Sequence, residues 1–361
     1  MRKFVKKKAP KLLWGMLIYA AIFLVLAAGG LVWFWNFINA YELSRPQTTM
    51  DTYLEQLPFD TVYEGAKPLV DQIDSNLQTP EQCKEYIRNA LSGGITYAKN
   101  LKECTDGKTV YMLISGGKTI GKTVLAAQPK NAYGFTDWVV AETTLDFSCL
   151  MGKDVTLTVD RSYTVRAGDF TLTQDYVTKD KIEYAALKEF YSDYQLPYLA
   201  TYEAGPVFGE LVLTVTDAKG AAVAVDENTD VDLFLNNCTE KEIGQIQALA
   251  DGFVQSYVHF TACTGNDSKS NYRKLAEHLV PNGPLVKRMY DALDGLSWVS
   301  DRGAYLDGMT VQRMSNIGSG KYLCDVTYDV RHSETMKTTS NLKLIMAQTD
   351  AGLRVEAMYS Y

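Results

Sequence analysis

Residues 322–331, with the sequence YLCDVTYDVR, show the most regular pattern in this chain of 361 residues. Every second residue from Tyr322 to Val330 is apolar or aromatic, and the residues between them are mostly polar. A period of two is typical of a β-strand whose two faces meet different surroundings. The pattern therefore predicts a half-buried strand in an antiparallel sheet.

The sequence on either side of this strand predicts an α+β domain over residues 226–361. Thr239 and Glu242 form a capping-box pattern at the start of a long amphipathic helix. A second helix is expected to continue to Pro281, and a third to cover about residues 284–293. Four strand patterns then close the sequence. Helices followed by consecutive antiparallel strands indicate helices packed on one face of a curved sheet.

This order of elements, over about residues 239–361, resembles the NTF2-like superfamily, a group of cone-shaped α+β domains. The sequence GLRVE at 352–356 is similar to the closing strand that is frequent in that group. The sequence GFTDWVV at 134–140 repeats the pattern earlier in the chain. The resemblance implies two diverged NTF2-like copies on either side of a small β module.

The chain as a whole is similar to uncharacterised membrane-anchored envelope proteins of Gram-positive bacteria. Relatives of those proteins include a teicoplanin-resistance-associated membrane protein, and the non-catalytic N-terminal domains of some penicillin-binding proteins are also NTF2-like. The resemblance implies a binding or scaffold role outside the cytoplasm. It does not imply transpeptidase activity, because it concerns non-catalytic domains.

Three segments are expected before the terminal domain. A polar connector covers residues 39–47, and residues 48–150 form an α+β segment for which an NTF2-like fold is one interpretation. In that segment the sequence TPEQ at 79–82 predicts a capped helix start, and Gly116-Gly117 predicts a hairpin turn. Residues 151–225 are rich in Thr, Val and Tyr and predict a small β module with little helix.

Residues 12–38, with the sequence LLWGMLIYAAIFLVLAAGGLVWFWNFI, contain no charged side chain and predict a transmembrane helix. A helix of this length measures about 40 Å, which exceeds the hydrocarbon core of about 30 Å. Six basic residues in the tail 1–11 predict a cytoplasmic N-terminus, so residues 39–361 are expected outside. A cleaved signal peptide is the alternative, but its apolar region usually covers only about 7–15 residues. The lipid bilayer is therefore the first expected partner.

Charge and motif context argue against nucleic acid and nucleotide as partners. Removing the six basic residues of the tail from the 36 in the chain leaves 30 against 43 acidic residues, a balance that repels phosphate backbones. Residues 116–123, GGKTIGKT, match the spacing of a phosphate-binding loop. Such a loop needs a helix directly after it, whereas Pro129 and β-like flanks predict a Gly-rich hairpin. We expect no nucleotide and no other cofactor.

The cysteines and histidines do not predict a metal site. The six cysteines are spaced without a CxxC pair, and their spacing leaves free thiols and one or two disulfides both open. They are Cys83, Cys104, Cys149, Cys238, Cys263 and Cys324. His259 and Cys263 are four residues apart and are expected on one helix face, but a zinc site needs three or four ligands.

Four residues are candidates for a cavity inside the terminal domain: Tyr257, His259, Asp325 and Asp329. The NTF2-like resemblance allows small-ligand binding or lyase and isomerase chemistry, which needs ionisable groups in an apolar pocket. No spacing unites the four, and Asp325 and Asp329 are expected on the strand face opposite Tyr328. We predict no catalytic residue.

The function predicted from these observations is that of a single-pass, membrane-anchored, extracytoplasmic binding or scaffold protein of the cell envelope, without catalytic activity. Its partner is expected to be an envelope protein, a peptide or a cell-wall polymer. One alternative is a small-ligand receptor or a lyase or isomerase that uses the terminal cavity. Another is a subunit of an envelope secretion or conjugation assembly.

Overall fold

The computed structural model describes residues 11–235, 238–296, 301 and 303–361, so the basic tail lies outside the described residues except for Lys11. The chain divides into two compact units. The first comprises Met1–Asp154 with Gly205–Leu211, and the second comprises Val155–Ala204 with Val212–Tyr361. Both contain antiparallel sheets, and helices accompany them, which confirms the α+β class.

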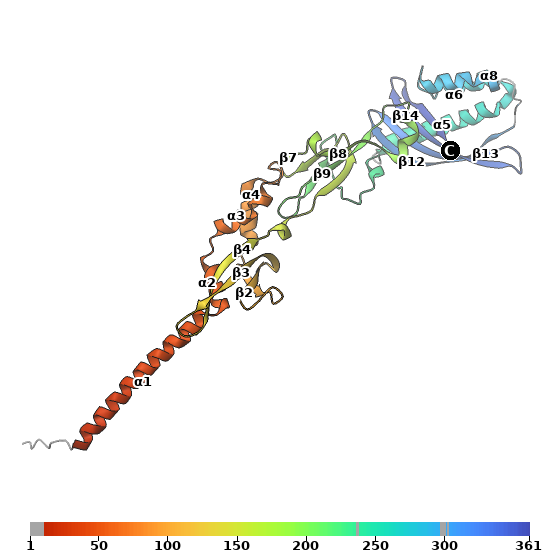
Figure 1. Ribbon diagram of the computed structural model, residues 1–361. Coiled ribbons are helices and arrows are strands. Elements are labelled where there is room, and N and C mark those ends of the chain that lie inside the picture. The colour runs from red at the N-terminus through yellow and green to blue at the C-terminus, as the bar shows by residue number, and fades with distance from the viewer. Residues whose placement is uncertain (1–10, 236–237, 297–300, 302) are drawn as a thin grey trace, which may run out of the picture. The chain divides into compact units, whose positions relative to one another are not determined.

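The first element is α1 (Lys11–Leu43), the long red helix of Figure 1. The stretch Trp14–Leu43 is long and apolar enough to cross a membrane. Every side chain from Trp14 to Asn36 is exposed, so this part of the helix packs against no protein core. The helix formed as predicted because its residues are apolar and it contains no proline.

The prediction of a polar connector over residues 39–47 is wrong. Asn39 to Leu43 continue α1, and α2 begins at Pro46, so only Ser44 and Arg45 separate the two helices. Proline suits the first turn of a helix but disfavours helical conformation in the residue before it. The break therefore falls directly before Pro46 and not at the first polar residue.

The first unit continues with helices followed by a four-stranded antiparallel sheet. The helices are α2 (Pro46–Gln56), α3 (Phe59–Val70) and α4 (Pro80–Ala90). The strands, in sheet order, are β1 (Thr96–Lys99), β2 (Lys108–Ser115), β3 (Lys118–Lys130) and β4 (Thr136–Leu145). The capping box predicted at residues 79–82 is present. Gly116 and Gly117 turn the chain between β2 and β3 with φ values of 55° and 77°, as a tight hairpin requires.

The β module of the second unit consists of two small antiparallel sheets. The first contains β5 (Val155–Asp160), β9 (Tyr198–Ala204) and β8 (Val177–Glu183), in that order. The second contains β11 (Ala222–Val223), β10 (Leu213–Thr216), β6 (Thr164–Ala167) and β7 (Phe170–Thr171). The module contains the short helix η3 (Ala185–Phe190), and η4 (Val231–Leu235) follows the module.

One segment of the predicted β module packs in the first unit instead. Residues 205–211 leave the module after β9 and pair with the chain near Gly152, whose N–H donates to the carbonyl of Val207 at 2.8 Å. Phe208 is buried there, and Gln78 both donates to and accepts from its backbone, at 3.1 and 2.8 Å.

The terminal domain has the predicted layout of helices followed by a four-stranded antiparallel sheet. Its helices are α5 (Glu240–Ala262), α6 (Ser268–Ala276), α7 (Pro284–Asp291) and α8 (Leu293–Leu296). Its strands, in sheet order, are β12 (Tyr305–Gly318), β13 (Lys321–Arg331), β14 (Lys337–Thr349) and β15 (Gly352–Ser360). Figure 1 shows α5 beside this sheet. This is the architecture that the NTF2-like resemblance implied, and the first unit shows the same order of elements.

The second helix of this domain is shorter than predicted, because α6 ends at Ala276 and not at Pro281. The residues that follow pair with β15. Val280 N–H donates to the carbonyl of Val355 at 2.9 Å, and Val355 N–H donates to the carbonyl of His278 at 2.8 Å. The tertiary pairing supplies the backbone with partners that a longer helix would otherwise provide.

Glu242 joins the start of α5 to the sheet. Its carboxylate accepts hydrogen bonds from the backbone N–H of Thr239 at 2.6 Å, the Tyr322 hydroxyl at 2.8 Å and the Asn316 amide at 3.1 Å. These bonds, the one from Thr239 foremost, hold the pKa of Glu242 below its ordinary value. Burial and the bond to Glu242 raise the pKa of Tyr322 to about 12.

We expect Glu242→Gln to weaken the domain and to reduce its sensitivity to acid. The carboxylate stabilises the fold above the unfolded-state pKa of about 4.3, and this contribution is lost as the pH falls through the lower folded-state pKa. The variant should lose about 1 kcal/mol of unfolding free energy at pH 7. Urea denaturation between about pH 3 and pH 7 measures both effects. Glu240→Gln, in the same exposed turn, is the control, and an acid dependence of Glu242→Gln equal to the wild type would contradict the assignment.

Candidate functional site

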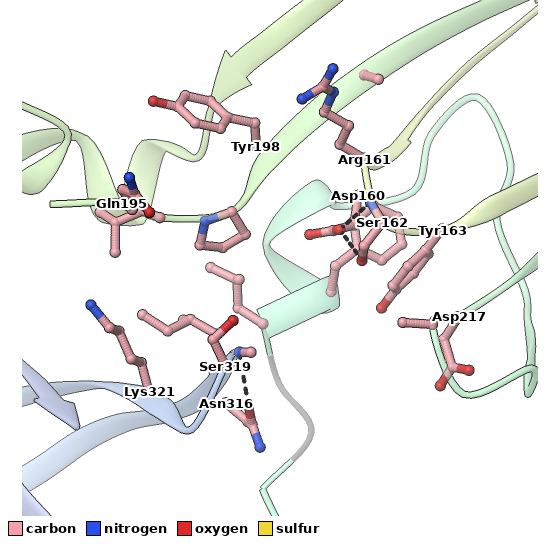
Figure 2. A pocket seen from close by; sticks show the side chains of 18 of the residues that line it. Asp160, Arg161, Ser162, Tyr163, Gln195, Tyr198, Asp217, Asn316, Ser319 and Lys321 are labelled. Carbon is pink, nitrogen blue, oxygen red and sulfur yellow. Dashed lines mark hydrogen bonds between the residues drawn. The ribbon is translucent and has the colours of Figure 1, made fainter. Parts of the chain in front are cut away.

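A cleft of about 960 Å³ opens on the second unit (Figure 2). Three of the segments that line it come from distant parts of the sequence. They are residues 160–163 at the end of β5 and after it, residues 195–198 before and at the start of β9, and residues 316–321 around the β12–β13 turn. Pockets of this size with convergent polar groups are the usual location of ligand sites.

A buried hydrogen-bond network fixes the rim of the cleft at residues 160–163. The hydroxyl of Tyr184, which is fully buried, donates to Oδ2 of Asp160 at 2.6 Å. The other carboxylate oxygen accepts from the N–H and the hydroxyl of Ser162, at 2.8 and 2.6 Å. Burial, and secondarily the bond to Asp160, raise the pKa of Tyr184 far above its usual value, so the phenol remains a donor. The buried Tyr184 and Asp160 side chains therefore fix the conformation of residues 160–163 at the rim.

Tyr184→Phe is expected to lower the free energy of unfolding by about 1–3 kcal/mol, because Asp160 would remain buried with one donor fewer. Tyr198→Phe is the matched control, since the structure gives its hydroxyl no hydrogen-bond partner among the described residues. That change should stay within about 0.5 kcal/mol. Urea denaturation of both variants compares them, and equal stability would refute the role of the network.

Several polar groups at the cleft have no hydrogen-bond partner among the residues that the structure describes. They are the side-chain polar groups of Tyr163, Gln174, Gln195, Tyr198 and Ser319. Two of the three cations that line the cleft are neutralised, because Arg161 contacts Asp180 at 2.8 Å and Lys321 contacts Glu356 at 2.7 Å. The third, Lys219, has no ion pair among the described residues. The cleft therefore offers mainly hydroxyl and amide groups to a polar ligand, together with the cation of Lys219 and the carboxylates of Asp160 and Asp217.

The described lining of the cleft contains no histidine or cysteine, and the carboxylate beside its Ser162 hydroxyl, that of Asp160, also accepts hydrogen bonds from the Ser162 N–H and from the buried Tyr184 hydroxyl. Its carboxylates already hold the backbone, since Asp217 accepts from the N–H groups of Lys219 and Ala221 at 2.8 Å and Asp160 accepts from Ser162. Covalent and acid–base catalysis both need a reactive group within reach of an activating partner. The lining supports binding better than catalysis.

The four residues predicted as cavity candidates are not brought together. Tyr257 lies on α5, where its ring stacks on Phe253 with centroids 5.9 Å apart, and burial raises the pKa of Tyr257. His259 is half-buried two residues further along the helix. Tyr328 points to the same side of the sheet, into the apolar cluster between helices and strands.

Asp325 and Asp329 lie on the opposite face of β13, as predicted. Arg313 is 3.8 Å from Asp325, but burial dominates and raises the pKa of this carboxyl. Asp329 accepts a hydrogen bond from Thr339 at 2.6 Å and contacts Lys337 at 2.9 Å, which lower its pKa. The sheet separates both carboxylates from Tyr257, so the four residues form no common site.

Apolar side chains fill the space between α5 and the sheet. Among the most buried are Phe253, Val254, Cys324, Leu344 and Met346, each with none of its surface exposed. Close-packed interiors leave little room for a ligand. The described part of the terminal domain therefore gives no support to a lyase, an isomerase or a small-ligand receptor acting inside the cone.

The expectation that His259 and Cys263 share a helix face is wrong. Cys263 adopts a left-handed conformation with φ 50° and ends α5, and its thiol donates to the carbonyl of Leu296 at 3.3 Å. No three His, Cys, Asp or Glu side chains within the described ranges could together hold a metal ion. All six cysteines are free thiols.

The phosphate-loop match is a β-hairpin, as predicted. Residues 116–123 form the β2–β3 turn and the start of β3, with no helix after them. Lys122 contacts Glu103 at 3.0 Å, and Thr123 is buried beside Thr143. A phosphate would find no helix N-terminus here.

Two Ser-x-x-Lys spacings also occur in strands and not in helices. Ser115 and Lys118 flank the β2–β3 turn, where the Ser115 hydroxyl donates to the carbonyl of Gly94 at 3.0 Å. Ser340 and Lys343 lie three positions apart in β14, so their side chains point to opposite faces. Neither pair can act as a serine nucleophile with its lysine base.

Comparisons with known proteins show similarity to several solved structures, and three of them follow, each at low identity. No protein-family model and no curated protein matches the chain. The first structure is titled "Ntf2-like, potential transfer protein TraM from Gram-positive conjugative plasmid pIP501", with 9% identity over 33% of this chain and 94% of that one, and a TM-score of 0.25.

The second, titled "Ntf2 like protein involved in plasmid conjugation", has 8% identity over 74% of this chain and 75% of that one, and a TM-score of 0.23. The third is the intermembrane space region of the chloroplast protein ARC6, with 14% identity over 31% of this chain and 94% of that one, and a TM-score of 0.21. At these scores the similarities do not bear on function, which depends on the chain's own residues.

Proposed function

We propose that this chain is a single-pass, membrane-anchored binding or scaffold protein of the cell envelope, without catalytic activity and with residues 39–361 outside the cytoplasm. The observation that carries the proposal is α1, whose side chains from Trp14 to Asn36 are all exposed. Burying one large apolar side chain stabilises a protein by about 1.5–3 kcal/mol, so a helix of such residues requires an apolar surrounding. A bilayer supplies it.

The orientation follows from the basic tail, because an excess of Lys and Arg marks the cytoplasmic side. Reporter fusions test it. A reporter that is active only outside the cytoplasm should be active when fused after Tyr41 and after Tyr361. Activity of a cytoplasmic reporter at either position would contradict the proposed topology.

The cleft of the second unit is the binding surface that the geometry supports best. Its uncommitted hydroxyl and amide groups favour a polar, weakly charged ligand, and among the expected partners a segment of cell-wall glycan fits this chemistry. An anionic polymer fits less well, because Arg161 and Lys321 are already paired with carboxylates, and the lining sets the carboxylates of Asp160 and Asp217 beside its remaining cation, Lys219.

Calorimetric titration of the full-length protein in detergent with soluble wall-glycan fragments tests this binding role. We expect saturable binding that is weakened at least tenfold by combining Gln195→Ala with Tyr198→Phe. Gln255→Ala, at an exposed position of α5 outside the cleft, should bind like the wild type. Unchanged binding by the double variant would show that the cleft is not the binding site, and it would leave the proposed membrane anchor unaffected.

The alternative of a secretion or conjugation subunit makes a different prediction. Such a subunit would associate stably with copies of itself or with other components. Mass photometry of the full-length protein in detergent measures its oligomeric state. A stable oligomer would favour the assembly subunit, since the binding or scaffold role proposed here does not require one.

A further inference from the structure

The turn between β3 and β4 lies against the C-terminal part of α1 within the first unit. The ring of Phe37 is 5.1 Å from that of Phe135 and 6.0 Å from that of Tyr133, measured between centroids. The ring of Tyr41 is 5.5 Å from that of Phe135. Phe37 is also the first side chain after Trp14 along α1 that is half-buried and not exposed. The turn therefore contacts α1 at a defined position along the helix, that of Phe37 and Tyr41.

The position of Phe37 along α1 corresponds to the headgroup region of a bilayer. Residue 25 is the midpoint of the charge-free run 12–38, and Phe37 lies twelve residues beyond it. At 1.5 Å per residue the separation is about 18 Å along the helix. The hydrocarbon core extends about 15 Å from the bilayer centre, and the headgroup region reaches about 20–22 Å. Phe135 and Tyr133, beside Phe37, lie at a similar depth.

Hydrogen bonds within the turn pair the backbone groups that would be costly to leave unpaired where there is little water. Oδ1 of Asn131 accepts from the N–H groups of Tyr133 and Phe135, at 3.0 and 3.1 Å. The N–H of Asn131 donates to the carbonyl of Phe135 at 2.8 Å, and that of Gly134 donates to the carbonyl of Asn131 at 2.9 Å. Unpaired backbone groups are costly away from water, and here these groups are paired within the turn.

We propose that Tyr133 and Phe135 insert into the headgroup region of the bilayer that α1 spans. The first unit would then contact the membrane at a second point besides its helix. Both rings are half-buried, so each packs on α1 with one part and leaves another part for lipid. Tyrosine is favoured at this depth because its ring is apolar and its hydroxyl is polar, and Phe135 adds apolar surface beside Tyr133. The inference rests on the proposed anchoring by α1.

Photocrosslinking to lipid tests the inference with the full-length protein in vesicles of phosphatidylglycerol and phosphatidylcholine. The photoreactive analogue p-benzoylphenylalanine is placed at Tyr133 or Phe135, where it conserves an aromatic ring. Phe34, exposed on α1, is the positive control. Thr119, exposed at the opposite end of β3, is the negative control. We expect lipid adducts at both turn positions at least fivefold above those at Thr119.

The outcomes separate this inference from the proposal on which it rests. Adducts at Phe34 combined with background levels at Tyr133 and Phe135 would overturn the inserted turn and leave the anchor intact. Background levels at Phe34 would overturn the anchor itself. Equal adducts at Thr119 and at the turn would also contradict the inference, because they would show no preference for this end of the sheet.

Discussion

Replacing Leu24 and Val25 together by arginine is expected to release the protein from the membrane fraction. Both residues lie near the middle of α1, and their side chains are 67% and 71% exposed, so the change removes no packing within the protein. Arginine at the centre of a membrane helix costs about 2.5–3.5 kcal/mol, whereas the apolar residues that it replaces are favourable. Two such changes should therefore disfavour insertion by about 6–8 kcal/mol.

Alkaline carbonate extraction followed by flotation measures this effect. The wild type should float with the lipid, and the double arginine variant should not. Leu24→Ala combined with Val25→Ala is the matched control and should still float, because alanine is tolerated in membrane helices. A double arginine variant that resists extraction as the wild type does would refute anchoring by α1.

The second large effect is expected for Phe253→Ala in the terminal domain. Phe253 is completely buried between α5 and the sheet and stacks on Tyr257. Removing a buried phenylalanine side chain costs about 3–5 kcal/mol, because the transfer free energy and the cavity left behind both count. We expect a large part of the domain's stability to be lost, since whole domains are stable by only about 5–15 kcal/mol.

Hydrogen exchange measured by mass spectrometry can localise this loss. Protection should fall in α5 and β13 of the variant, while β2 and β3 of the first unit keep theirs, because the two units have separate cores. Tyr290→Ala is the control, since its side chain is 60% exposed. Wild-type protection in the Phe253→Ala variant would be incompatible with a filled interior.

Local signals in the sequence predicted those parts of the fold that local physics determines. The capping boxes at Thr79 and Thr239, the alternation along β13 and the apolar α1 each depend on residues within a few positions of one another. The structure contains all of them. The end of α6 was predicted wrongly because the residues after it, His278 and Val280, pair with Val355, more than 70 positions further along the sequence.

The cleft could not be predicted for the same reason. Its lining joins residues 160–163 and 195–198 to residues 316–321, and no spacing relates these segments. The bond between Tyr184 and Asp160 connects residues 24 positions apart through a buried site. Two local signals at the cleft were Asp160 followed by Ser162 and Asp217 followed by Lys219, pairs typical of turns held by the aspartate side chain.

The candidate residues of the terminal domain show that the alternation along a strand predicts the face on which a side chain lies but not its neighbours. The alternation placed Asp325 and Asp329 correctly on the face opposite Tyr328. It could not indicate that Arg313, Lys337 and Thr339 would contact these carboxylates, because those partners come from neighbouring strands. A strand pattern defines faces, and only the register of the sheet defines neighbours.

Protease protection tests the central claim, display of the chain outside the cytoplasm through α1, most directly. Proteinase K is added to sealed right-side-out membrane vesicles that contain the full-length protein with an N-terminal tag. We predict digestion of the chain after α1 and survival of a small tagged fragment that ends near Leu43. Survival of the full-length protein in sealed vesicles, with digestion only after the vesicles are opened by detergent, would contradict the account.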